Sequence, residues 1–222
     1  MEPPRSYPLV ARGFTLVEML ITLSIITIIT AVALTGQTTF NRSILLNDTA
    51  YTVALSGRQA QSLGLSSRKF EGVQNGGYGL HFAYTAPTKS YSIFADVQAI
   101  AATPGWCPIV ATTTPEAKAG NCLYDGVNET FQTYELIQGF SISDFCGKAG
   151  GTLQCAANGG IQSLDILYLR PNTEAIITGI TAGGSKVQYS CAQVSVKSPT
   201  SDTVQTIRMS QLGEISVGQT CP

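Results

Sequence analysis

The sequence RGFTLVEMLITLSIITIITAVAL, residues 12–34, decides the fold. It opens with Arg12 and Gly13 and is apolar from Phe14 onward, and its only charged side chain beyond that point is Glu18. A carboxylate at the centre of a bilayer costs a few kcal/mol. A carboxylate within a membrane-spanning segment is therefore expected to have a function.

The residues around this run predict a leader and one long helix. Residues 1–13 contain three prolines within the first eight positions, so they cannot be helical throughout. Residues 14–63 contain no proline, and we expect them to form a single helix. Its first part, residues 14–34, is apolar on every side and about long enough to cross a hydrocarbon core.

The second part of this helix is amphipathic. Phe40, Ile44, Tyr51 and Leu55 recur at helical spacing and predict an apolar stripe. Such a stripe needs a partner, and we expect that partner to be the downstream domain, residues 64–222.

Beyond the helix the periodicity changes to two, which indicates strands. Strands at 78–84 and 90–97 are expected to form a hairpin across a loop that contains Pro87. Further strands are expected at 134–143, 163–169, 174–178, 187–196, 203–210 and 214–217. Residues 98–133 lack periodicity and are predicted to be irregular and pinned by disulfides. The predicted fold class is α+β, with the long helix packed on antiparallel β-sheets.

All six cysteines follow residue 106, and an even count in an exported region indicates disulfides. Six cysteines allow 15 pairings, and buried free thiols are the alternative. Our prediction joins nearest neighbours along the chain: Cys107 with Cys122, Cys146 with Cys155, and Cys191 with Cys221.

The remaining composition argues against an enzyme, a metal site or a cofactor. The chain has no CxxC pair, so a zinc site is not expected. His81 is the only histidine, and we expect it to be a half-buried or exposed strand residue. The aspartates are scattered without calcium-loop spacing, and Glu129 and Glu135 are expected to be solvated. A net charge of −1 gives no electrostatic case for nucleic acid.

The Gly13-Phe14 pair with Glu18 and the following apolar run resembles the class III signal of type IV pilins and type II secretion pseudopilins. The resemblance implies that a prepilin peptidase cuts after Gly13 and that the new N-terminus, Phe14, is methylated. It also implies that Glu18 pairs with the amine of a neighbouring subunit in a filament.

The globular part is similar to H-type minor pseudopilins, in which a long helix packs on antiparallel sheets. The matching segments are 78–82, 90–96, 164–166, 170–172, 175–177, 206–208 and 213–217. The 98–133 segment and the six cysteines depart from that pattern. Thr35-Gly36 stands where many major pilins carry a proline, which argues against a major subunit.

The resemblance implies an inner-membrane protein whose C-terminal domain lies outside and whose partners are pilin or pseudopilin subunits, a prepilin peptidase, an inner-membrane assembly platform and membrane lipid. Three alternatives stay open at this point. The chain could be a plain membrane anchor with an incidental Glu18. It could be a soluble protein cut by signal peptidase after Ala33, in the sequence Ala31-Val32-Ala33. The β-domain could also be a tip adhesin or a module that binds DNA or secreted cargo.

Overall fold

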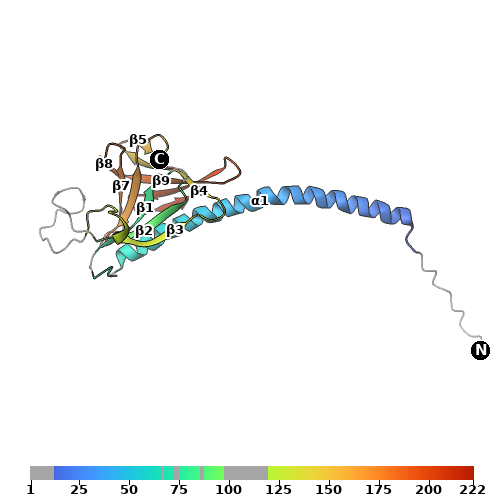
Figure 1. The fold of residues 1–222 in the computed structure, drawn as a ribbon, viewed down its shortest axis with the longest axis horizontal. Helices are drawn as coiled ribbons and strands as arrows, with labels where there is room; N and C mark the ends of the chain where they lie inside the picture. The colour runs from blue at the N-terminus through green and yellow to red at the C-terminus, as the bar shows by residue number, and fades with distance from the viewer. Residues whose placement is uncertain (1–12, 67, 73–75, 86–87, 98–119) are drawn as a thin grey trace, which may run out of the picture. The chain divides into compact units, whose positions relative to one another are not determined.

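The computed structural model describes residues 13–66, 68–72, 76–85, 88–97 and 120–222; the side chains of 35–40 lie outside this description. The chain divides into two compact units, residues 1–43 and residues 44–222, which are described separately below. Helix α1 (Leu16–Leu65) contributes residues to both (Figure 1).

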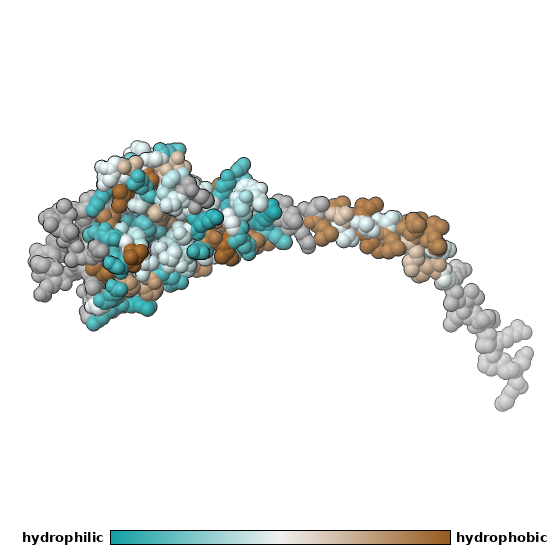
Figure 2. Space-filling view, in the orientation of Figure 1, coloured by the Kyte–Doolittle hydropathy of each residue, from teal (hydrophilic) through white to brown (hydrophobic). Residues whose placement is uncertain are grey.

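In the first unit, α1 begins at Leu16, two residues later than the sequence predicts. The first residues of a helix have no acceptor four positions earlier, so its start depends on a capping side chain. Thr15 supplies that cap, and Phe14 therefore lies before the helix. Every residue from Gly13 to Leu34 is exposed, and Figure 2 shows brown apolar side chains along this helix, interrupted by paler ones.

In the second unit, the buried side of α1 is not the predicted stripe. Ile44, Tyr51 and Leu55 are 49%, 58% and 63% exposed, and the side chain of Phe40 lies outside the described residues. The buried positions are mostly small residues: Leu46, Ala50, Val53, Ala54, Ser56, Gly57, Ala60 and Gly64. The prediction of the packing face was wrong because it weighted large apolar side chains.

Close approach to the sheets explains the small residues. A Cβ atom at Gly57 would lie 3.1 Å from Ile215 Cδ1 and 3.5 Å from Leu80 Cδ1. A Cβ atom at Gly64 would clash with the backbone carbonyl of Tyr168. The helix can approach the strands this closely only because these positions carry no side chain.

Two antiparallel sheets form the rest of the second unit. The six-stranded sheet has the order β3 (Thr130–Glu135), β2 (Ser90–Asp96), β1 (Gly77–Ala83), β6 (Ser163–Tyr168), β7 (Ala175–Ile180), β8 (Lys186–Tyr189). The five-stranded sheet has the order β11 (Ile215–Val217), β10 (Val204–Ser210), β9 (Cys191–Lys197), β4 (Ser141–Ala149), β5 (Thr152–Cys155). A short 3-10 helix, η2 (Val127–Glu129), precedes β3. The α+β prediction is confirmed.

The predicted hairpin is present as β1 paired with β2, but two other predicted strands were wrong. The 134–143 segment divides between β3 and β4, and the 187–196 segment divides between β8 and β9. In both cases the chain leaves one sheet and enters the other, a tertiary event that alternation along the sequence does not signal. Strand β5 was not predicted, and β3 begins inside the segment that was expected to be irregular.

Candidate functional site

The start of α1 is built by the sequence Thr15-Leu16-Val17-Glu18. The backbone N–H of Glu18 donates to Thr15 Oγ1 at 3.3 Å, so Thr15 is the N-cap. A Ser or Thr followed three residues later by Glu is a known helix-start pattern. Thr15 was not among the predicted functional residues, although its spacing from Glu18 identifies a helix start. The negative charge of Glu18 also suits the first turn, where the helix dipole is positive.

Gly13 and Phe14 lie just outside this cap. Phe14 is 74% exposed, and Gly13 is exposed as well. A Cβ atom placed on Gly13 would meet no atom within 4 Å. The folded chain therefore has room for a larger residue at position 13, and packing does not explain why this position is glycine.

Glu18 is exposed within the first unit, and among the described residues its carboxylate makes no ion pair. Its predicted role requires a partner from another subunit, and an unpaired, exposed carboxylate leaves that role available.

The apolar segment Leu16–Leu34 is long enough and apolar enough to cross a membrane. Its 19 residues correspond to about 28 Å of helix at ~1.5 Å per residue, close to the ~30 Å hydrocarbon core. None of this segment is buried within the protein. Its four hydroxyl side chains bond to the helix itself: Thr22, Ser24, Thr27 and Thr30 donate to the carbonyls of Met19, Ile21, Leu23 and Ile26.

In the second unit, the structure brings the lone histidine next to a carboxylate. His81 Nδ1 lies 2.6 Å from Asp165 Oδ1, and the Tyr124 ring lies over the imidazole with centroids 4.1 Å apart. Ser92 is the cross-strand partner of His81 on the other side. The Ser92 hydroxyl contacts Thr133 Oγ1 at 3.2 Å instead of the imidazole. A nucleophile in hydrogen-bond contact with its base is the mark of a Ser-His-Asp site, and these described residues lack it.

The structure also corrects our expectation for Glu129. The predicted solvated carboxylate is fully buried, whereas Glu135 is exposed as predicted. Glu129 accepts hydrogen bonds from the backbone N–H groups of Val97 and Asp125 at 3.0 and 2.8 Å. Buried carboxylates need such donors. The local sequence did not signal this burial, because one donor, Val97, lies 32 residues away along the chain.

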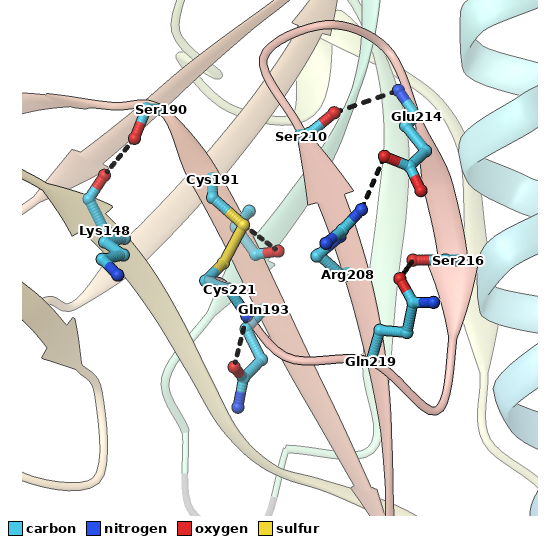
Figure 3. The surroundings of a disulfide bond; sticks show 11 residues. Lys148, Ser190, Cys191, Gln193, Arg208, Ser210, Glu214, Ser216, Gln219 and Cys221 are labelled. Atoms are coloured by element: carbon cyan, nitrogen blue, oxygen red, sulfur yellow. Dashed lines mark hydrogen bonds and ion pairs between the residues drawn. A yellow bond between two sulfur atoms is a disulfide. The ribbon is translucent and has the colours of Figure 1, made fainter. Parts of the chain in front are cut away.

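Two of the nearest-neighbour disulfides are present among the described residues: Cys146–Cys155 and Cys191–Cys221. Cys122 is also disulfide-bonded, and its predicted partner, Cys107, lies outside the described residues. Figure 3 shows Cys221 linked to the start of β9 through Cys191. Asp144 lies near Cys146 and Cys155, but both sulfurs are already bonded to each other and do not form a metal site with it.

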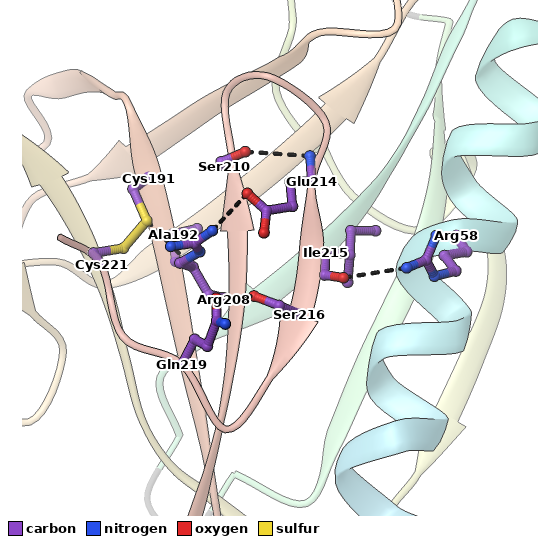
Figure 4. Close-up of polar contacts among 10 residues, drawn as sticks. All are labelled: Arg58, Cys191, Ala192, Arg208, Ser210, Glu214, Ile215, Ser216, Gln219 and Cys221. Carbon is purple, nitrogen blue, oxygen red and sulfur yellow. Dashed lines mark hydrogen bonds and ion pairs between the residues drawn. A yellow bond between two sulfur atoms is a disulfide. The ribbon is translucent and has the colours of Figure 1, made fainter.

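A pocket of about 380 Å³ lies beside the Cys191–Cys221 bond. Its charged lining residues are Lys148, Arg208 and Glu214, and Arg208 and Glu214 form an ion pair with each other. Strands β10 and β11 form a hairpin beside this pocket. Arg58 of α1 donates to the carbonyl oxygen of Ile215 in β11 at 3.2 Å (Figure 4). The Arg208–Glu214 and Arg58–Ile215 contacts therefore stabilise the β10–β11 edge of the five-stranded sheet.

One family model matches the chain, and it covers the segment with the cap, Glu18 and the apolar helix. The model is described as the prokaryotic N-terminal methylation motif and matches residues 10–34. Comparisons with curated proteins and with solved structures give no match. The functional assignment therefore depends on the N-terminal segment.

Proposed function

We propose, from the premise that the chain is a type IV pilin-like protein of the prepilin-processed kind, that it is a minor, H-type subunit of a type II secretion pseudopilus or a type IV pilus. The observation that carries this proposal is the N-terminal methylation motif on a fully exposed apolar helix. The six-stranded and five-stranded sheets support it as the globular part of such a subunit.

The first step of the proposed function is processing. A prepilin peptidase cuts after Gly13 and leaves a mature chain of 222 − 13 = 209 residues that starts at the methylated Phe14. Both residues are exposed, and the fold does not require glycine at position 13. A requirement for a residue without a side chain then comes from the protease, which must admit the backbone into its active site.

The second step is assembly from the inner membrane. The apolar side chains of 16–34 are exposed in their own unit, so lipid covers them before assembly and the helices of other subunits cover them afterwards. The exposed Ile44, Tyr51 and Leu55 add apolar surface for the same contacts. The assembly platform in the membrane and the other subunits are the partners that this route needs.

Glu18 fixes the axial position of the subunit. In a filament its carboxylate pairs with the methylated amine of Phe14 from a neighbouring subunit. A buried ion pair contributes little net stability, but removing one partner leaves a buried charge and costs about 3–5 kcal/mol. The pair therefore selects one register over others.

The first test is co-expression of the full chain with a prepilin peptidase, followed by intact mass and N-terminal sequencing. We expect a start at Phe14 with the added mass of one methyl group. Gly13→Leu should block this cut, and Ala33→Leu should leave it unchanged. A mature start at Leu34 that Ala33→Leu abolishes would identify an ordinary secreted protein and refute the proposal.

The second test separates assembly from processing. Glu18→Ala should be cut normally but should not enter filaments, because it removes the proposed partner of the Phe14 amine. Thr22→Ala is the matched control, since Thr22 is also exposed near the start of the same helix and bonds only within it. Normal incorporation of Glu18→Ala, measured by immunoblot of sheared filaments, would contradict the assembly role.

A further inference from the structure

The pocket beside the Cys191–Cys221 bond lies on one face of the five-stranded sheet. Lys148 on β4 pairs with Cys191 on β9, and Cys191 pairs with Ser210 on β10. Directly opposed residues of antiparallel strands project to the same side, and so does Arg208, two positions before Ser210 on β10. In Figure 3 the disulfide lies between Lys148 and Arg208. The strand register therefore gathers two cations around one disulfide.

The other walls of this pocket include apolar groups. Leu212, which follows β10, lines it and is 78% exposed. The exposed Pro222 and the buried Cys191 line it as well. A volume of about 380 Å³ lies within the range of small-molecule sites, which combine apolar walls with a few polar groups. The pocket therefore offers both kinds of contact to one small ligand.

Both cations have donors that the described residues do not use. Lys148 is half-buried, yet no carboxylate in the described part of the chain, that of Pro222 included, lies within 4.0 Å of its ammonium. Only its backbone carbonyl is engaged, as acceptor of the Ser190 hydroxyl at 3.1 Å. Arg208 pairs with Glu214 through Nη2, and its Nε has no acceptor among these residues. A guanidinium has five N–H donors, so most of its capacity is unused.

We propose that this pocket binds a small ligand that carries one carboxylate on an apolar body. The ligand carboxylate accepts hydrogen bonds from the Lys148 ammonium and the Arg208 guanidinium, and the apolar body contacts Leu212. Charge-assisted bonds of this kind are stronger than neutral ones, and a guanidinium matches the geometry of a carboxylate. Binding here does not depend on the filament role proposed above.

The test uses two probes that differ in one charge. N-acetyl-L-leucine carries the carboxylate, and N-acetyl-L-leucinamide has the same apolar body without it. Each is titrated into the full chain in an uncharged detergent, and binding is followed by saturation-transfer NMR with detergent alone as the blank. We expect saturable binding of the acid with a dissociation constant of about 1 mM or tighter. The amide should bind at least about tenfold more weakly.

Variants of one lysine test the assigned contact. Lys148→Met should weaken binding of N-acetyl-L-leucine by about tenfold and leave the thermal midpoint unchanged, because the ammonium has no partner within the described chain. Lys148→Arg keeps the charge and should stay within about threefold of the wild type. Lys197→Met is the matched control, since it removes the same charge from β9 outside the pocket and should not change binding.

A longer probe identifies the source of the carboxylate. If acetyl-Ala-Ala-Leu with a free carboxyl end binds at least as tightly as N-acetyl-L-leucine, the ligand is the carboxyl end of a peptide. If it binds more weakly, the ligand is a small organic acid; both results support a carboxylate site. Equal binding of the acid and the amide, equal binding to wild type and Lys148→Met, or no saturable binding of the acid up to about 10 mM would overturn the proposal.

Discussion

Two parts of helix α1 differ in which side chains they bury. Residues 16–34 carry leucines, isoleucines and valines, and all of them are exposed within their own unit. Residues 46–64 bury a face composed mainly of alanine and glycine, while Ile44, Tyr51 and Leu55 remain outside. The buried face of the helix is thus made mostly of small residues, whereas most of its large apolar side chains are exposed within the chain.

The difference has a physical origin. A helix packed closely on a sheet gains contacts through its backbone and short side chains, as at Gly57 and Gly64. A helix segment that faces lipid can instead leave bulky apolar side chains exposed, because lipid tails are as apolar as leucine.

The strongest test of this contrast compares two leucines on the same helix. Leu46→Ala removes a side chain that is 4% exposed, so it should lower the free energy of unfolding by about 2–5 kcal/mol. Leu55→Ala removes one that is 63% exposed and should change it by less than about 0.5 kcal/mol. Denaturant unfolding of the full chain in detergent measures both. Equal losses would mean that the predicted stripe also packs within the subunit.

The polar contact between helix and sheet should make stability depend on alkaline pH. Burial raises the pKa of Tyr91 from 10.0 to about 12, although the hydrogen bond between its hydroxyl and Ser56 opposes the shift. The folded state therefore holds this proton more tightly than the unfolded state does. The raised pKa of Tyr91 adds to the free energy of unfolding. This addition is complete below pH 10 and is lost as pH rises through 12, by about 2–3 kcal/mol in all.

Stability curves from pH 8 to 12 for the wild type and Tyr91→Phe check this expectation. The variant should show a shallower decline above pH 10, because it lacks the titrating hydroxyl. Burial also raises the pKa values of Tyr78, Tyr168 and Tyr189, so some decline should remain in the variant. Identical slopes in the two proteins would contradict the assignment to Tyr91.

A pair of glycines gives a third test. Gly64→Ala places a Cβ atom against the Tyr168 carbonyl and should cost about 1–3 kcal/mol, although alanine is the better helix former. Gly13→Ala meets no atom within 4 Å and should leave the thermal midpoint unchanged. An increase in midpoint for Gly64→Ala would show that the helix end does not lie as close to β6 as described.

The smallest expected effect is at the helix start. Thr15→Ala removes the oxygen that accepts the Glu18 N–H and should weaken the first turn by about 1 kcal/mol. Amide hydrogen exchange in detergent should become faster at Val17 and Glu18 and stay unchanged in residues 46–64. Unchanged exchange in the first turn would mean that Thr15 is not the cap.

Local patterns in the sequence predicted the elements that depend on them. The apolar run and the absence of proline predicted one long helix, and alternation predicted the hairpin of β1 and β2. Both elements are present. Chain order also predicted the Cys146–Cys155 and Cys191–Cys221 pairs, which close short loops.

Long-range events could not be predicted in the same manner. The transfer of the chain from β3 to β4 and from β8 to β9 depends on pairing between strands far apart in the sequence, such as β4 with β9. Burial of Glu129 depends on a donor from Val97, 32 residues away, that only the fold brings close. The packing face of α1 depends on the distance to the sheets, which no helical periodicity records.

The hydroxyl groups of Thr22, Ser24, Thr27 and Thr30 have a consequence for how the apolar segment changes surroundings. Each already donates its proton to a carbonyl of its own helix, so none needs water, lipid or a neighbour as an acceptor. The segment can exchange one apolar environment for another with its full set of these bonds intact. In the proposed transfer from lipid to a filament, these four hydroxyl groups therefore add almost no hydrogen-bonding cost.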